Sequence, residues 1–298
     1  MKSSLALSLL SASLGAQAAP LATTENVHAS NLLSTRQTAS ESADPVPAPA
    51  TTWDPPAQLV APLKAVWDHE ISTYSDALGF RNYGYDQVIA NNGSINYCVR
   101  WESDTKVSAE TRSLAEKAIQ RQFKKWMDVL KGFDGWPYDE VPVKVVGWAV
   151  RDKGVLEGDT SGLQVYTGKD ADGIPQCDEA CGRFFHQDGD YSGCKAGVDR
   201  HYDQSLWITD SMEFGAGAGG DWGQRLSEQE FVAGLEKDNI ETVLHELGHT
   251  FALDDFYDWV PTGVTNFIML ANSADHITEF DAWMLRDWWR NLKSRYDL

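Results

Sequence analysis

Three long segments of the chain place apolar residues at helical spacing. The clearest is residues 109–130, which Ser108 precedes as a candidate N-cap and Gly132 ends. Residues 61–75 and 278–293 show the same periodicity, and in the second of these the aligned side chains are Phe280, Trp283, Met284 and Trp288. The pattern predicts three amphipathic helices packed on a core, with a sugar-binding aromatic face as the alternative for the C-terminal one.

Four shorter runs have the composition and alternation of strands. They are residues 95–101, 141–150, 163–167 and 205–209. We expect residues 205–209 to form an exposed edge, along which an extended substrate could lie. Together with the helical segments, these runs predict an α+β fold in which helices cover a twisted mixed sheet.

The segments between these elements lack periodicity. Residues 79–92, 168–200 and 215–223 are rich in Gly and polar residues, so we expect all three to be loops. Residues 170–173 and 188–190 repeat Asp at the spacing of a calcium loop. They lack its full pattern and its closing Glu, so solvated turns are favoured there over calcium sites.

Local polar residues mark the starts of two further helices. Ser227 and Glu230 have the spacing of a capping box, in which each side chain bonds the backbone N–H of the other residue. Asn239 is expected to cap the next helix, whose periodic residues end near Leu253.

The N-terminal residues have the composition of a secretory signal peptide. Lys2 precedes an apolar run over residues 5–14, and Ala16-Gln17-Ala18 is a small-residue cleavage pattern. The run is shorter than the roughly 20 residues of a membrane-spanning helix. Residues 1–18 are therefore expected to be removed. Residues 19–52, rich in Ser, Thr, Ala and Pro, are expected to be a disordered leader or propeptide, which leaves residues 53–298 as one domain.

The charge balance limits the partners of this protein. The sequence has 25 Lys and Arg against 44 Asp and Glu, a formal net charge of −19. Such a surface repels phosphate backbones, so nucleic acid is excluded as an expected partner. No later segment has the length and composition of a membrane span, so we expect a secreted, extracellular monomer. Asn92-Gly93-Ser94 is an acceptor sequence for an N-glycan on such a protein.

The four cysteines predict two disulfides, because an even count after a signal peptide is typical of oxidised secreted proteins. Three connectivities can be drawn. We favour the local pair Cys177–Cys181 together with Cys98–Cys194. A zinc site built on Cys177 and Cys181 is the alternative, which an oxidising compartment disfavours.

The residues that carry chemistry are His245-Glu246-Leu247-Gly248-His249. On a helix, His245 and His249 lie one turn apart on one face, so their imidazoles can share a metal ion. Glu246 lies beside them, where its carboxylate can take a proton from a water molecule that zinc has acidified. The alternative is a buried histidine pair bonded to carbonyl groups.

The stretch from Thr242 to Leu270 resembles the metzincin zinc peptidases. Its first part, His245-Glu-Leu-Gly-His249-Thr-Phe-Ala-Leu-Asp-Asp255, is similar to their signature, with Asp255 at the third-ligand position. This Asp, with Tyr257 two residues later, is similar to the pattern of the snapalysin-type secreted bacterial members.

Two further positions bear on this resemblance. Met269, within Ile268-Met269-Leu270, falls where the family has a Met-turn that lays a methionine beneath the metal. Ala252 replaces the family's glycine at the turn after the helix, and alanine adopts a positive φ less readily than glycine.

The resemblance implies a zincin-like fold with an antiparallel edge strand, a long active-site helix and a C-terminal helix. It implies that His245, His249 and Asp255 hold Zn²⁺ and that Glu246 is the general base. Tyr257 is expected either to assist at the oxyanion or to serve as a packing residue. Alternative third ligands are Asp254, Asp258 and, in the manner of gluzincins, Glu279.

The expected function is that of a secreted zinc-dependent endopeptidase acting on protein or peptide substrates, with residues 53–298 as its catalytic domain. Two alternatives stay open. One is a secreted carbohydrate- or cell-wall-binding protein with a structural or vestigial metal, which would use some of the 12 Trp residues. The other is a metal-dependent hydrolase of a different acyl bond, because zinc and a Glu serve both reactions.

Overall fold

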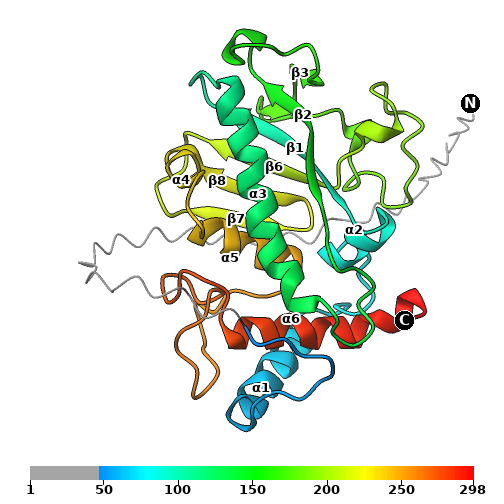
Figure 1. Ribbon diagram of the computed structural model, residues 1–298, viewed down its shortest axis with the longest axis vertical. Coiled ribbons are helices and arrows are strands. Elements are labelled where there is room, and N and C mark those ends of the chain that lie inside the picture. The colour runs from blue at the N-terminus through cyan, green and yellow to red at the C-terminus, as the bar shows by residue number, and fades with distance from the viewer. Residues whose placement is uncertain (1–46) are drawn as a thin grey trace, which may run out of the picture. The chain divides into compact units, whose positions relative to one another are not determined.

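A six-stranded sheet organises the part of the chain that the computed structural model describes, residues 47–298 (Figure 1). The strands lie in the order β3 (Val165–Tyr166), β2 (Val143–Val150), β1 (Ile95–Glu102), β6 (Gln204–Thr209), β8 (Gly223–Ser227) and β7 (Gly217–Gly220). All neighbours pair in parallel except β7, which is antiparallel to β8. The expected signal peptide and most of the expected leader lie outside the described residues.

Helices cover one face and one end of this sheet. They are α1 (Ala57–Thr73), α2 (Gly84–Ala90), α3 (Ala109–Leu130), α4 (Glu228–Gly234), α5 (Glu241–Thr250) and α6 (Glu279–Leu292). α3 lies over the sheet beside α5, while α6 crosses the end of α3 and packs against α1 (Figure 1). The fold is therefore α+β with a mostly parallel sheet, and α3 has the predicted bounds.

Side chains of β1 alternate between two apolar clusters. Tyr97, Val99 and Trp101 belong to the large core beneath the helices, whereas Cys98 belongs to a smaller cluster on the other face. This alternation follows from the period of two along a strand. Both faces of the central strands are therefore covered.

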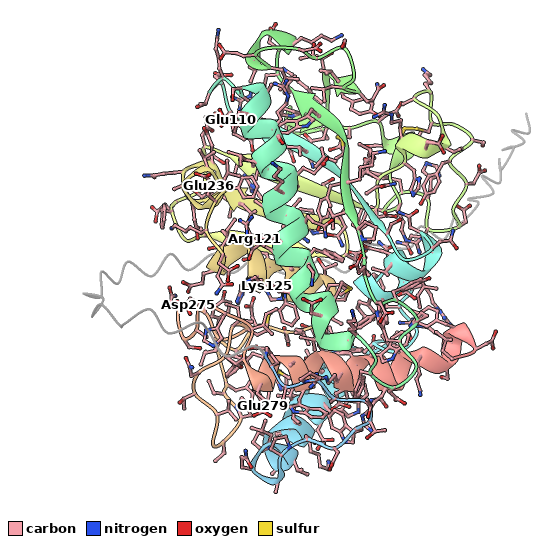
Figure 2. All side chains as sticks on the ribbon, viewed as in Figure 1. Glu110, Arg121, Lys125, Glu236, Asp275 and Glu279 are labelled. Carbon is pink, nitrogen blue, oxygen red and sulfur yellow. A yellow bond between two sulfur atoms is a disulfide. The ribbon has the colours of Figure 1, made fainter. Side chains whose placement is uncertain are left out.

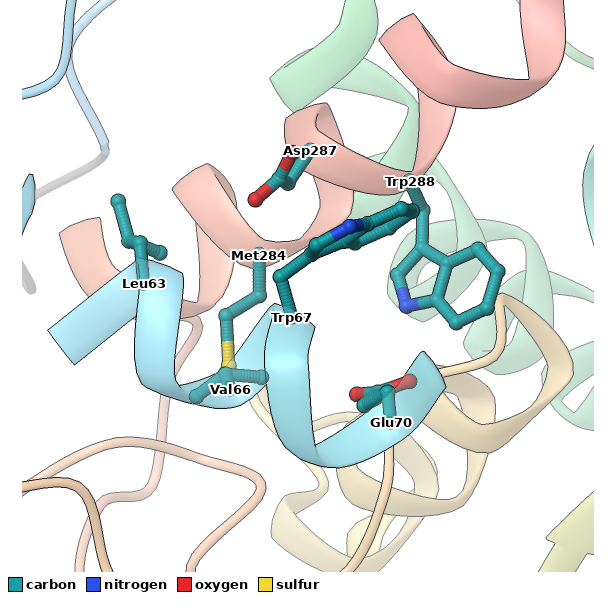
Figure 3. Close-up of a pocket in the computed structure, with 7 residues that line it drawn as sticks. All are labelled: Leu63, Val66, Trp67, Glu70, Met284, Asp287 and Trp288. Atoms are coloured by element: carbon teal, nitrogen blue, oxygen red, sulfur yellow. The ribbon is translucent and has the colours of Figure 1, made fainter. Parts of the chain in front are cut away.

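The C-terminal helix packs on the core as predicted. Phe280, Trp283, Met284 and Trp288 are all buried. Met284 and Trp288 of α6 face Leu63, Val66 and Trp67 of α1 (Figure 3). The aromatic residues of α6 are thus used in packing, and the sugar-binding alternative for this helix was wrong.

The prediction for the edge of the sheet was also wrong. β6, which contains residues 205–209, lies between β1 and β8. The edge strand is β7, which lies in the segment 215–223 that we expected to be a loop. Its glycines have low strand propensity, and contacts with α5 hold it in place, so the local sequence gave no strand signal.

Residues 79–92 contain a short helix where a loop was predicted. α2 buries Tyr85 and Val88 completely. The Tyr85 hydroxyl donates a hydrogen bond of 2.9 Å to the Leu285 carbonyl of α6. Tertiary packing has therefore overridden the weak local helix propensity of a Gly- and Asn-rich segment.

The two predicted disulfides are present, but with a different pairing. Cys98 is bonded to Cys177, and Cys181 to Cys194. Cys177 directly follows β5 (Pro175–Gln176), which packs against β1 and β2 and so brings it beside Cys98. The local pair that we favoured, Cys177–Cys181, was wrong because strand packing directs Cys177 to the sheet.

The segment 168–200 is mostly irregular, as predicted. It contains the two-stranded hairpin of β4 (Gly168–Lys169) and β5, together with short 3-10 turns. Asp170 accepts hydrogen bonds from the backbone N–H groups of Asp172 and Ile174 and from the Arg100 side chain. Asp188 likewise accepts from a backbone N–H, so both Asp-rich stretches form turns that satisfy their own carboxylates.

Two predicted helix starts differ in detail. Ser227 precedes α4, but its side chain makes no capping hydrogen bond there. α5 begins after Ile240, one residue later than a cap at Asn239 would give. No helix within residues 47–298 combines the length and the apolar character needed to cross a membrane.

Candidate metal centre

α5 carries the two histidines of the motif on one face. The ring centroids of His245 and His249 are 4.9 Å apart, and the ring planes meet at 84°. His245 is 6% exposed, and it shares its face of the helix with His249 because the two residues are four positions apart. The predicted placement of two imidazoles one helical turn apart is present in the structure.

Backbone carbonyls fix the orientation of both rings. His245 Nδ1 lies 2.8 Å from the Ile268 carbonyl oxygen, and His249 Nδ1 lies 2.8 Å from that of Leu253. A carbonyl oxygen only accepts, so each Nδ1 carries the hydrogen. In a neutral ring this leaves the Nε2 lone pair available for a metal ion.

Asp255 brings a carboxylate oxygen to both free nitrogens. Its Oδ1 lies 3.0 Å from His245 Nε2 and 3.4 Å from His249 Nε2. In a tetrahedral zinc site with bonds of about 2.0–2.1 Å, adjacent ligand atoms are about 3.3 Å apart. The spacing of these three atoms therefore fits the first coordination sphere of a zinc ion.

The electrostatics of these groups favour a positive charge between them. Burial lowers the pKa of His249, but the hydrogen bond and charge of Asp255 outweigh burial and raise it to about 9. The pKa of His245 is raised for the same reasons. Burial raises the pKa of Asp255, yet hydrogen bonds from both imidazoles hold it well below its ordinary value. A divalent cation bound between these groups would supply the same positive charge and compete with protons for the imidazoles.

Glu246 lies beside the two histidines and is 5% exposed. Its Oε2 is 3.8 Å from His249 Nε2. Ligand atoms of His245, Glu246 and His249 all lie within 4.8 Å of one another, so this group could hold a metal ion. Burial raises the pKa of Glu246, with the imidazoles acting in the opposite direction.

A methionine lies directly against the motif helix. Met269 is fully buried, and a Cβ added to Gly248 would lie 2.9 Å from its Cε and 3.4 Å from Trp126 Cζ2. A Cβ this close would force Met269 to shift, because real Cβ atoms essentially never come within 3.0 Å of another atom. Gly248 therefore lets Met269 pack directly against the motif helix.

Asp281, which the sequence analysis missed, fixes this methionine segment. Its carboxylate accepts hydrogen bonds from the backbone N–H groups of Ile268 at 2.9 Å and Met269 at 3.2 Å. It also accepts from the N–H and hydroxyl of Thr278, the N-cap of α6. The Thr278-x-x-Asp281 spacing could have indicated a capping box, but no local signal links it to the metal centre.

Ala252 makes the turn that directs Asp255 back to the histidines. It has a left-handed φ of 67°. Its N–H bonds the His249 carbonyl at 3.0 Å, and Leu253 N–H bonds the Gly248 carbonyl at 3.1 Å. The turn after α5 is thus formed by an alanine in a conformation that costs L-residues about 1–2 kcal/mol.

The alternative third ligands point elsewhere or lie at the surface. Asp254 Oδ1 accepts hydrogen bonds from the Tyr74 hydroxyl of α1 and from the Asp255 N–H, both at 2.9 Å. Asp258 is exposed, and so is Glu279 in the first turn of α6 (Figure 2).

Tyr257 is 72% exposed near the mouth of the site. Partial desolvation and the charge of Asp255 raise the pKa of its hydroxyl, so that it remains a hydrogen-bond donor at neutral pH.

Neither a protein-family model nor a curated protein matches this chain.

Proposed function

We propose that this protein is a zinc-dependent endopeptidase of the metzincin type. The observation that carries the proposal is the convergence of His245 Nε2, His249 Nε2 and Asp255 Oδ1 at the separations of metal ligands. Three protein ligands and one open position are typical of catalytic zinc sites, whereas structural sites are closed by four. The buried methionine packed against Gly248 of the motif helix and the left-handed turn at residue 252 add support to the resemblance.

His245, His249 and Asp255 would hold the ion, and Glu246 would handle protons. Bound zinc would supply Lewis acidity, which polarises a carbonyl group and acidifies water. Glu246 accepts a proton from the attacking water and passes it to the leaving amine, since its carboxylate lies beside the imidazoles without being bound by them. Tyr257, whose side chain is exposed, would donate a hydrogen bond from its hydroxyl to the oxyanion that forms.

The antiparallel edge strand supports a peptide as the substrate. β7 pairs with β8 on one side and ends the sheet on the other, next to α5. An extended peptide can pair its backbone with such an edge, which leaves its side chains to reach pockets on alternate sides. The two disulfides are in keeping with secretion, as the N-terminal sequence also indicates.

The test is zinc analysis of the purified protein together with casein hydrolysis before and after chelation. We expect one zinc per chain, loss of hydrolysis on chelation and recovery when zinc is added back. Glu246→Gln should keep its zinc and lose activity by at least about 10²-fold, because general acid–base catalysis contributes that much. Glu236→Gln, at an exposed carboxylate after α4, is the matched control and should behave like the parent.

A companion pair of variants distinguishes the third ligand. Asp255→Ala should lower zinc affinity and activity together. Asp254→Asn keeps an oxygen that can accept from Tyr74 and from the Asp255 N–H, and it should retain zinc. Full activity of Glu246→Gln would refute the mechanism. Hydrolysis of esters but not of casein would show that the substrate contains an acyl bond other than a peptide bond.

A further inference from the structure

A second face of α5 contacts the edge strand β7. Thr242, Glu246 and Thr250 are spaced four residues apart, so they lie in one row along the helix, beside the row that holds the histidines. β7 lies along this row. The general base of the proposed reaction is therefore the central residue of a helix–strand contact.

The residues of β7 that contact α5 are glycines, so the strand contributes only backbone atoms to this contact. Gly217 and Gly219 share one face of β7 because strand residues alternate. A Cβ on Gly217 would lie 2.7 Å from Thr242 Cγ2 and 2.8 Å from Glu246 Cδ. A Cβ on Gly219 would lie 2.9 Å from Glu246 Cα and from its carbonyl carbon. The β7 backbone thus packs directly on the backbone and carboxylate of Glu246.

Hydrogen bonds anchor β7 to the helix on both sides of Glu246. Before the strand, Glu230 accepts from the Gly215 N–H at 2.8 Å and from the Thr242 hydroxyl at 2.7 Å. At its other end, the Thr250 hydroxyl donates to the Gly220 carbonyl at 2.9 Å. These anchors lie one helical turn before and one turn after Glu246, so the strand cannot move away from it freely.

The carboxylate of Glu246 is consequently held between two surfaces. Its Oε1 faces Gly217, and its Oε2 lies 3.8 Å from His249 Nε2. We propose that Gly217 is a positioning residue for the general base, an inference that rests on the proposed function. The space where a side chain would stand is filled by the Glu246 carboxylate, and the strand backbone behind it keeps that carboxylate turned to the histidines.

The test begins with Gly217→Ala. The added methyl group would displace the Glu246 carboxylate, and its nearest contacts are with Glu246 and Thr242, neither of which is a proposed zinc ligand. We expect unchanged zinc content, nearly unchanged KM and a fall in kcat on the order of 10²-fold, the effect of misplacing a catalytic group by about 1 Å. Gly162→Ala is the control, because Gly162 lies outside β7 and a Cβ there would meet no atom within 4 Å.

Two double variants separate positioning from general crowding. Thr242→Ser removes Cγ2 and keeps the hydroxyl that Glu230 binds. In Gly217→Ala/Thr242→Ser, the added methyl group therefore no longer clashes with residue 242, and the clash with Glu246 remains. Restored activity in this variant would overturn the proposal, because Thr242 would then be the cause. Glu246→Asp shortens the carboxylate, so adding Gly217→Ala to it should fold and cause no further loss of kcat. An additive loss would also overturn the proposal.

Crystal structures of the parent and of Gly217→Ala give a readout independent of turnover. We expect the Glu246 carboxylate to move away from β7 while His245, His249 and Asp255 stay in place. An unmoved carboxylate refutes the positioning role whatever the activity. If the parent hydrolyses no peptide with zinc, the proposed function fails instead, and the displacement still decides whether Gly217 positions Glu246.

Discussion

At the scale of single residues, Ala252 is the strained position of the candidate site. Its φ of 67° places an L-residue in the left-handed region, and the hydrogen bonds of the turn hold it there. The strain is retained because this turn brings the Leu253 carbonyl to His249 and Asp255 to both imidazoles. The backbone conformation here thus serves the geometry of the site.

Ala252→Gly should stabilise the protein. Removing the left-handed penalty of about 1–2 kcal/mol is partly offset by the greater freedom of glycine in the unfolded chain, about 0.4–1 kcal/mol, so we expect a gain of roughly 0.5–1 kcal/mol. The free energy of unfolding in urea measures it. Ala233→Gly in α4 is the control of opposite sign, because glycine within a helix loses about 1 kcal/mol. A loss of stability in Ala252→Gly would show that the turn is not strained.

The residues that could be predicted are those whose spacing is local. His245, Glu246 and His249 follow from helical periodicity, and Asp255 from its place in a signature only eleven residues long. Asp281 and Glu230 hold the methionine segment and the edge strand by bonds to residues 12 or more positions away. Because these bonds depend on how α6 and α4 pack, no local pattern could reveal them.

At the scale of elements, periodic segments were predicted well and glycine-rich ones were not. α3 could be located because its buried positions follow a period near 3.6, and β1 because apolar residues alternate with other residue types along 95–101. β7 was missed because its stability comes from α5 and β8 and not from its own residues. The order of strands is a long-range property, which explains the wrong assignment of β6 to the edge.

The contact between α1 and α6 should depend on pH through Glu70. This residue is 1% exposed and lies close to Asp287 and Trp288 (Figure 3). Burial, and then the charge of Asp254, raise the pKa of Glu70 well above its ordinary value. The folded state therefore favours the protonated acid. Its contribution to stability is full below the pKa of the unfolded chain and is lost as the pH rises toward the folded pKa.

Glu70→Gln should remove this dependence, because an amide has no proton to lose. We expect the variant to gain stability over the parent increasingly as the pH rises from about 5 to about 8. Urea unfolding across that range measures the difference. Asp68→Asn changes an exposed carboxylate on the same helix and should leave the pH slope unchanged. Parallel slopes for Glu70→Gln and the parent would contradict the protonated state of Glu70.

At the scale of the whole domain, the sheet separates the apolar core from a cluster that contains the disulfides. The helix-covered face holds the large apolar core and the candidate metal centre, whereas the other face holds the smaller cluster around all four cysteines. Two disulfides could be predicted from the cysteine count. Their pairing could not, because it depends on β5 packing against β1.

The two disulfides should differ in their effect on stability because they close loops of different length. Cys98–Cys177 spans 79 residues and Cys181–Cys194 spans 13. Chain entropy then gives about 4.5 kcal/mol for the longer loop and about 2.9 kcal/mol for the shorter one. We therefore expect Cys98→Ser/Cys177→Ser to lose about 1.6 kcal/mol more unfolding free energy than Cys181→Ser/Cys194→Ser.

Urea unfolding of the two double variants tests this difference, and each serves as the control for the other because both leave two buried hydroxyl groups. An equal loss, or a larger one for the shorter loop, would mean that local packing and not loop closure governs the stabilisation. Because the cysteine cluster and α5 lie on opposite faces of the sheet, zinc affinity should be unchanged in any variant that remains folded. A loss of zinc from a folded variant would show that the sheet transmits strain from one face to the other.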